Sequence, residues 1–208
     1  MSIALLFTIL GAGIISSLEY LYLRYGEGQI FKRLITAFIR KNPTFFEGSE
    51  LSSDQIKKLI QEGEHEQLEF KSSLRKNIHT NKIDKKIEHA VIKTITAFLN
   101  TDGGTLLVGI KDDGTLAGID QDGFSSSDKF YQHYTNLVQN HIGNEYLPLI
   151  KSKLLNIHNS QILKIDCKQS AKPVFLEIGN DQEFYVRIGP TSVQLKGKKL
   201  LEYVHKRF

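Results

Sequence analysis

The chain has 208 residues, of which 40% are hydrophobic, and its 27 Lys and Arg residues exceed its 23 Asp and Glu residues to give a formal net charge of +4. This length leaves little room for two full domains, and the composition argues against a chain that is disordered throughout. The single cysteine, Cys167, excludes an internal disulfide and a cysteine-rich zinc site. The mild basic excess is compatible with a polyanionic partner but does not require one.

Residues 1–25 are predicted to form a transmembrane anchor. The stretch from Ile3 to Leu23 is almost entirely apolar, small or aromatic, with Glu19 as its one charge near one end. A helix of this length spans roughly 30 Å, the thickness of a bilayer core. Basic residues only follow the stretch, so the positive-inside rule predicts a single-pass membrane protein with its C-terminal domain in the cytoplasm. A cleaved signal peptide and a buried core helix are the alternatives.

Residues 26–50 are predicted to form a basic juxtamembrane helix and a linker. Between Gln29 and Lys41, apolar residues recur at helical spacing with four basic residues among them, and Asn42-Pro43 ends the helix. Such a helix would lie on the anionic inner leaflet of the membrane. An ordinary helix packed on the following domain explains the same pattern equally well.

Residues 51–208 are predicted to form an α+β domain with a mixed or antiparallel sheet and two main helices, preceded by the one transmembrane helix. Apolar periodicity predicts helices over about 53–61, 84–99, 128–141 and 198–208. Strands are predicted over about 67–71, 105–110, 116–119, 149–157, 162–167, 174–178 and 183–188. The Asp113-Gly114 pair predicts a hairpin between the second and third of these strands, and 72–82 reads as a basic loop.

Three stretches of this domain together resemble the Schlafen AlbA-like family. They are Glu64–Lys71 (EHEQLEFK), Ala97–Ile110 (AFLNTDGGTLLVGI) and Phe184–Gly189 (FYVRIG). The second stretch is specific in length and order, and the resemblance covers about residues 51–191. Members of this family occur in many bacterial proteins and in animal Schlafens. The resemblance implies nucleic-acid binding and, from the animal proteins, metal-dependent cleavage of structured RNA such as tRNA.

The resemblance also implies a set of catalytic residues. Glu64, Glu69 and Asp112 match the three carboxylates that act in animal Schlafens, with Asp112 at the end of the apolar strand expected to lie beside Glu69. Three carboxylates at one point repel one another unless a divalent cation neutralises them, and Mg²⁺ or Mn²⁺ suits oxygen ligands. Lys71 could then contact the phosphate. The alternatives are solvated charges for the glutamates and Lys71, and a turn-forming role for Asp112.

Nine basic residues are candidate contacts to nucleic-acid phosphates, since lysine and arginine bind phosphates without reading sequence. They are Lys71, Arg75, Lys76, Lys82, Lys85, Lys86, Lys168, Lys172 and Arg187. The cluster from Arg75 to Lys86 is the densest, and scattered solubilising charge is the alternative for any one of them. The sequence has no phosphate-binding loop of the ATPase kind, so ATP is not an expected cofactor.

Three functions therefore remain open. The first is a membrane-anchored, metal-dependent endoribonuclease. Animal Schlafens form a groove between two related lobes, and this chain has one copy, so this reading requires a homodimer. The second is a nucleic-acid-binding domain without catalysis, with RNA favoured over DNA. The third is a module that recruits a protein partner at the membrane.

Overall fold

The computed structural model describes residues 53–208, with side chains from Gln55 onward. The predicted anchor (1–25) and juxtamembrane segment (26–50) lie outside the described residues. The centre of the fold is a four-stranded sheet with the order β1-β4-β6-β5. Its strands are β1 (Leu68–Lys71), β4 (Gly104–Val108), β5 (Ile150–Ile157) and β6 (Ser160–Cys167). Strands β1 and β4 are parallel and the other pairs are antiparallel, so the predicted mixed sheet is confirmed.

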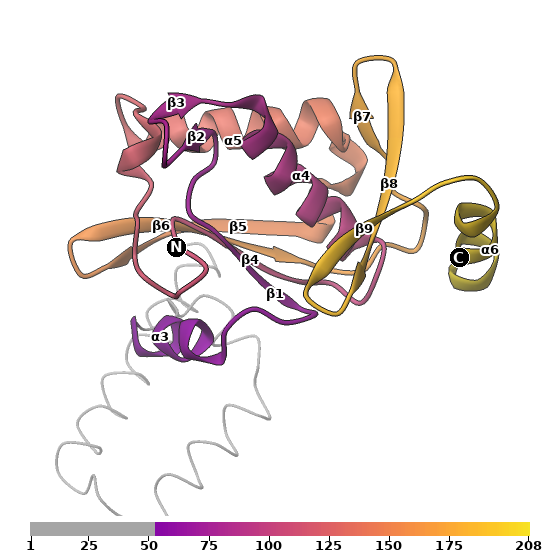
Figure 1. The fold of residues 1–208 in the computed structure, drawn as a ribbon, viewed down its shortest axis with the longest axis horizontal. Helices are drawn as coiled ribbons and strands as arrows, with labels where there is room; N and C mark the ends of the chain where they lie inside the picture. The colour runs from indigo at the N-terminus through magenta and orange to yellow at the C-terminus, as the bar shows by residue number, and fades with distance from the viewer. Residues whose placement is uncertain (1–52) are drawn as a thin grey trace, which may run out of the picture. The chain divides into compact units, whose positions relative to one another are not determined.

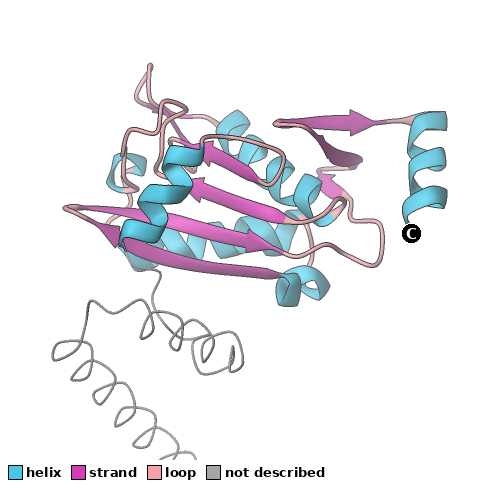
Figure 2. Ribbon diagram, turned by 90° about the horizontal axis from the view of Figure 1, so that it is seen from below, coloured by secondary structure: helices cyan, strands magenta, loops and turns pink. Residues whose placement is uncertain are grey.

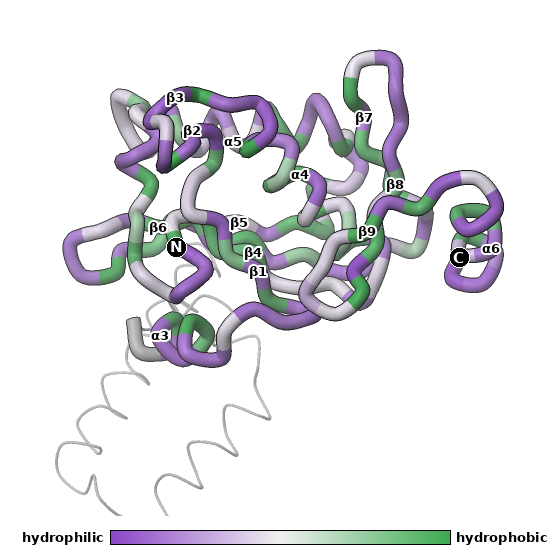
Figure 3. The backbone as a smooth tube through the Cα atoms, viewed as in Figure 1, coloured by the Kyte–Doolittle hydropathy of each residue, from purple (hydrophilic) through white to green (hydrophobic). Residues whose placement is uncertain are grey.

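Helices cover both faces of this sheet. The two long helices α4 (Lys85–Leu99) and α5 (Ser127–His141) lie on one face, and α3 (Ser53–Glu62) lies on the other (Figures 1 and 2). The alternation of side chains along β4 divides the core accordingly. Leu106 packs into the cluster under α4 and α5, whereas Leu107 packs with Phe70 and with Ile56 of α3. The hydrophobic colouring of the central strands in Figure 3 reflects burial on both faces.

The turn predicted at Asp113-Gly114 is confirmed, but the strand predicted over 116–119 does not form. Strand β4 pairs with β1 and β6, and the returning segment makes only one isolated bridge, between Ile110 and Leu116. Gly109 has a φ of +100° and accepts hydrogen bonds from the backbone N–H groups of Ala117 and Gly118. The left-handed backbone at Gly109 therefore turns the chain out of the sheet before a second strand can pair. The segment continues into a 3-10 turn over Asp120–Asp122.

A second, three-stranded antiparallel sheet packs beside α4. It consists of β7 (Leu176–Ile178), β8 (Asp181–Ile188) and β9 (Thr191–Leu195), in that order. Strand β9 was not predicted, because its short and partly exposed sequence carries little apolar alternation. The last helix, α6 (Gly197–Arg207), has no buried residue and is tied to the domain by a hydrogen bond from the Tyr203 hydroxyl to the Asn100 carbonyl.

The basic stretch predicted as a loop contains a small antiparallel hairpin. Strand β2 (Lys76–Asn77) pairs with β3 (Lys82–Ile83) ahead of α4. Asp84 then caps α4, since its side chain accepts a hydrogen bond from the Lys86 backbone N–H. A 3-10 helix (Asn144–Leu149) connects α5 to β5. The remaining predicted helices and strands match the structure to within a few residues.

The predicted membrane localisation is corrected. Within residues 53–208, no helix has the length and apolar character needed to cross a bilayer. The segment on which that prediction depended is outside the described part of the chain.

Candidate nucleic-acid interface

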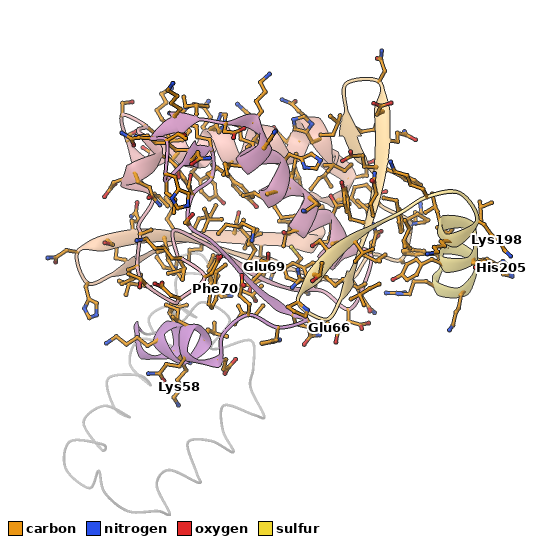
Figure 4. The ribbon with its side chains drawn as sticks, in the orientation of Figure 1. Lys58, Glu66, Glu69, Phe70, Lys198 and His205 are labelled. Atoms are coloured by element: carbon orange, nitrogen blue, oxygen red, sulfur yellow. The ribbon has the colours of Figure 1, made fainter. Side chains whose placement is uncertain are left out.

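The Glu69 carboxylate is held by two cationic side chains. Glu69 lies on the α4 side of β1, and the neighbouring Phe70 points to the opposite side, toward α3 (Figure 4). One carboxylate oxygen is 2.5 Å from the Lys71 Nζ, and the other is 2.9 Å from the Arg187 Nη1. Both oxygens are therefore already neutralised within the fold, and Lys71 is engaged with Glu69 and with the Phe70 carbonyl.

The other two predicted catalytic carboxylates, Glu64 and Asp112, do not share the partners of Glu69. Glu64 accepts a hydrogen bond of 2.8 Å from the Phe70 backbone N–H through Oε1. Asp112 is exposed in the tight turn after β4, which is closed by the bond from the Gly114 N–H to the Lys111 carbonyl. Across residues 53–208, no three His, Cys, Asp or Glu side chains are grouped so that they could hold a metal ion. The arrangement of these carboxylates therefore does not fit Mg²⁺ or Mn²⁺.

Arg187, a predicted phosphate contact, is buried. Its side chain is only 1% exposed, so it has no access to a phosphate at the surface. Besides the ion pair with Glu69, it donates to the carbonyls of His65 (2.9 Å) and Glu66 (3.2 Å), and its guanidinium lies 4.9 Å from the centre of the Phe98 ring. Arg187 thus fixes β8 to the chain entering β1 and to the end of α4.

Asn100 joins the second and third family-like stretches in the same way. Its buried side-chain amide donates to the carbonyls of Val174 (2.8 Å) and Tyr185 (3.0 Å) and accepts from the Val174 N–H (2.8 Å). Together with Arg187, it brings the three stretches that carry the resemblance into one hydrogen-bonded network. Asn100 and Arg187, which belong to the family-like stretches, therefore stabilise the fold by linking its strands and loops.

Asp122 anchors the base of the basic hairpin, and sequence reasoning missed it. The buried Asp122 carboxylate accepts hydrogen bonds from the Ser73 hydroxyl (2.7 Å) and from the backbone N–H groups of Leu74 (3.0 Å) and Arg75 (2.9 Å). The Arg75 side chain donates to the Asp122 carbonyl and lies 3.5 Å from the centre of the Phe124 ring. Arg75, a predicted phosphate contact, therefore has a structural role at the foot of the hairpin.

Beyond this anchor, the chain forms a protruding surface that we call the basic hairpin, residues 76–86. Its turn is shaped by Asn77, whose side-chain oxygen accepts from the N–H groups of His79 and Thr80. Lys82, Lys85 and Lys86 are exposed and Lys76 is half-buried. None of these four ammonium groups pairs with a carboxylate in the described part of the chain, which leaves their charges available to a ligand.

The remaining predicted contacts, Lys168 and Lys172, lie at the opposite end of α4. They are exposed in the connection from β6 to β7, which is fixed by the hydrogen bond from the Ser170 N–H to the Leu99 carbonyl. The basic hairpin leads into the first turn of α4, and the 15 residues of that helix span about 22 Å. The structure thus brings together the predicted contacts of the basic hairpin, whereas Lys168 and Lys172 lie apart and Lys71 and Arg187 are engaged with Glu69.

Comparison with known proteins gives a family and a fold. A family model described as "Schlafen, AlbA_2" matches residues 64–196. The crystal structure of the DIP2311 protein from Corynebacterium diphtheriae superimposes with a TM-score of 0.51 at 16% sequence identity, covering 74% of this chain and 28% of that chain. At this identity the similarity indicates a shared fold. Among curated proteins, none matches this chain in sequence.

Proposed function

Because the chain belongs to the Schlafen, AlbA_2 family, we propose that it binds nucleic acid through the basic hairpin, with RNA preferred over DNA. The observation that carries this proposal is the set of four lysines without carboxylate partners in the described structure, gathered on one hairpin whose base is hydrogen-bonded to Asp122. Ammonium groups placed in this way contact backbone phosphates and release counterions, which supplies affinity without reading the sequence.

Two exposed aliphatic side chains favour a ligand with unstacked bases, such as a loop or bulge of RNA, over a duplex. Ile78 and Ile83 are 43% and 63% exposed and lie among the lysines of the basic hairpin. Apolar side chains beside phosphate-binding lysines suit strands whose bases are unstacked. Loops and bulges of RNA present such bases, whereas a regular DNA duplex keeps its bases stacked.

Cleavage is not part of this proposal. The endoribonuclease hypothesis requires Glu69 as a free carboxylate near Glu64 and Asp112, and Glu69 is instead held by Lys71 and Arg187. Binding by the basic hairpin does not depend on a second copy of the chain, so the homodimer prediction is not needed for it either.

A triple variant tests the proposed function. Replacing Lys82, Lys85 and Lys86 by alanine removes three exposed charges from the basic hairpin and should weaken binding of a single-stranded RNA by about 10- to 100-fold at low salt. The slope of log affinity against log salt concentration should become shallower by about 2, because each lost phosphate contact contributes roughly 0.7 for a single strand. Fluorescence anisotropy of a labelled RNA across a salt series measures both quantities.

The matched control removes the same charge elsewhere. Lys198, Lys199 and Lys206 are exposed on α6, and Figure 4 shows Lys198 on that helix, away from β1. Alanine at these three positions should leave the affinity and the salt slope close to those of the unmodified protein. Equal weakening by the two triple variants would mean that only overall charge matters, and no weakening by the hairpin variant would contradict the proposal.

A further inference from the structure

We propose that a pocket beside the basic hairpin holds one unpaired base of the bound strand, an inference that rests on the proposed function. The pocket has a volume of about 440 Å³ and lies between α4, the end of α5 and the turn from β7 to β8. Pockets of roughly 300–1,000 Å³ are the usual size for small organic ligands. Its lining includes Lys85, Lys86, His89, Ile92, His141 and Ile178.

The pocket is continuous with the basic hairpin. Lys85 and Lys86 belong to the hairpin surface and also line the pocket. A strand whose phosphates contact these two lysines would therefore have a base within reach of the pocket. The lysines can contact a phosphate while the adjoining pocket holds the base of the same nucleotide. This arrangement favours a nucleotide of the bound strand over an unrelated ligand.

The interior of the pocket suits the faces of a base. Ile92 is buried in the core under α4, and Ile178 packs partly against the same core. The half-buried side chains of Ile178 and His89 offer contacts to a flat aromatic ligand. His89 is itself held edge-on to the Tyr185 ring, with the ring centres 6.1 Å apart.

Two histidines supply hydrogen-bonding atoms for the edge of a base. The His141 Nδ1 lies 2.6 Å from the Glu177 carbonyl, and because a carbonyl oxygen only accepts, this nitrogen carries the hydrogen. In the neutral ring Nε2 is then an acceptor. The His89 Nε2 lies 2.6 Å from the Glu183 carboxylate and donates to it, so in the neutral ring Nδ1 is the corresponding acceptor. Within residues 53–208, neither acceptor has a hydrogen-bond partner.

Glu88 also lines the pocket and Glu183 bonds to its His89, and both carboxylates already have hydrogen-bond partners. The Glu88 carboxylate lies 2.7 Å from the Nε2 of His133, and Glu183 accepts from both His89 and the Tyr185 hydroxyl. Their pairing reduces the repulsion that a nearby phosphate would otherwise meet.

The test compares single-stranded RNA of about 16 nucleotides with a blunt duplex of the same sequence. Ile178→Trp adds a large ring to the pocket, and His141→Ala removes one hydrogen-bonding group from it. Ile188→Trp adds the same ring at a position on β8 that is 59% exposed, which makes it the matched control. Circular dichroism and urea unfolding establish that each variant is folded before binding is measured.

We expect Ile178→Trp and His141→Ala to weaken single-strand binding by about tenfold, in line with the loss of one stacked base. Duplex binding should stay unchanged in both variants, and Ile188→Trp should behave as the unmodified protein. If either pocket variant is folded and binds the single strand normally, the pocket inference is overturned while the basic hairpin stands. If the unmodified protein binds neither RNA, the proposed function fails and the inference fails with it.

Discussion

Replacing Asn100 by alanine is expected to lower the free energy of unfolding by about 3–5 kcal/mol, because three hydrogen bonds inside the core disappear together. The Val174 N–H and the carbonyls of Val174 and Tyr185 would lose the partner that the Asn100 side chain provides. Each buried polar group left without a partner costs about 1–3 kcal/mol. Urea unfolding followed by circular dichroism measures the change.

An exposed asparagine provides the control for this substitution. Asn136→Ala removes the same side chain from the exposed side of α5 and should change the free energy of unfolding by less than about 0.5 kcal/mol. A loss below about 1 kcal/mol in Asn100→Ala would mean that this amide does not hold the two family-like stretches together.

Replacing Arg187 by methionine is expected to cost about 3–5 kcal/mol of stability, because it leaves the half-buried Glu69 carboxylate without its main partner. Arg187→Lys should not restore stability, since a lysine cannot reproduce the several directed bonds that the guanidinium makes to Glu69, His65 and Glu66. The double variant Arg187→Met, Glu69→Leu should be more stable than Arg187→Met alone, because both charges are then removed. Urea unfolding of the unmodified protein, Arg187→Met, Glu69→Leu and the double variant gives the coupling energy directly.

The surface ion pair on α6 is the reference for this cycle. Lys198 lies 3.5 Å from Glu202, and both side chains are largely exposed. Breaking it with Lys198→Met should have no measurable effect on stability. If Glu69→Leu left stability unchanged while abolishing cleavage of RNA, Glu69 would be a catalytic residue rather than a structural one, and our account of the network would be wrong.

Much of the fold could be predicted from the sequence because its strongest patterns are local. The apolar periodicity of α4 and α5 and the continuous apolar run of β4 each determine their own element. The small hairpin of β2 and β3 was missed, since its pairing depends on the distant Asp122. The strand expected over 116–119 did not form for a similar reason, because the partners of β4 are β1 and β6.

The candidate site was predicted in part. The dense basic cluster was visible in the sequence, and Lys76, Lys82, Lys85 and Lys86 do share one exposed surface. The burial of Arg187 could not be recognised, because a charged residue on a strand is buried only when a partner such as Glu69 lies opposite it. Arg187 and Glu69 are more than a hundred positions apart in the sequence, so only the folded chain shows that they pair.

The central claim is that nucleic acid lies on the basic hairpin, and the most direct test is to locate the contact without altering the protein. An RNA strand containing 4-thiouridine would be bound to the full chain and cross-linked by ultraviolet light, and the modified residues identified by mass spectrometry. Our account predicts cross-links within residues 76–92, on the basic hairpin and the first half of α4. Cross-links confined to the Lys168–Lys172 connection or to α6 would contradict it.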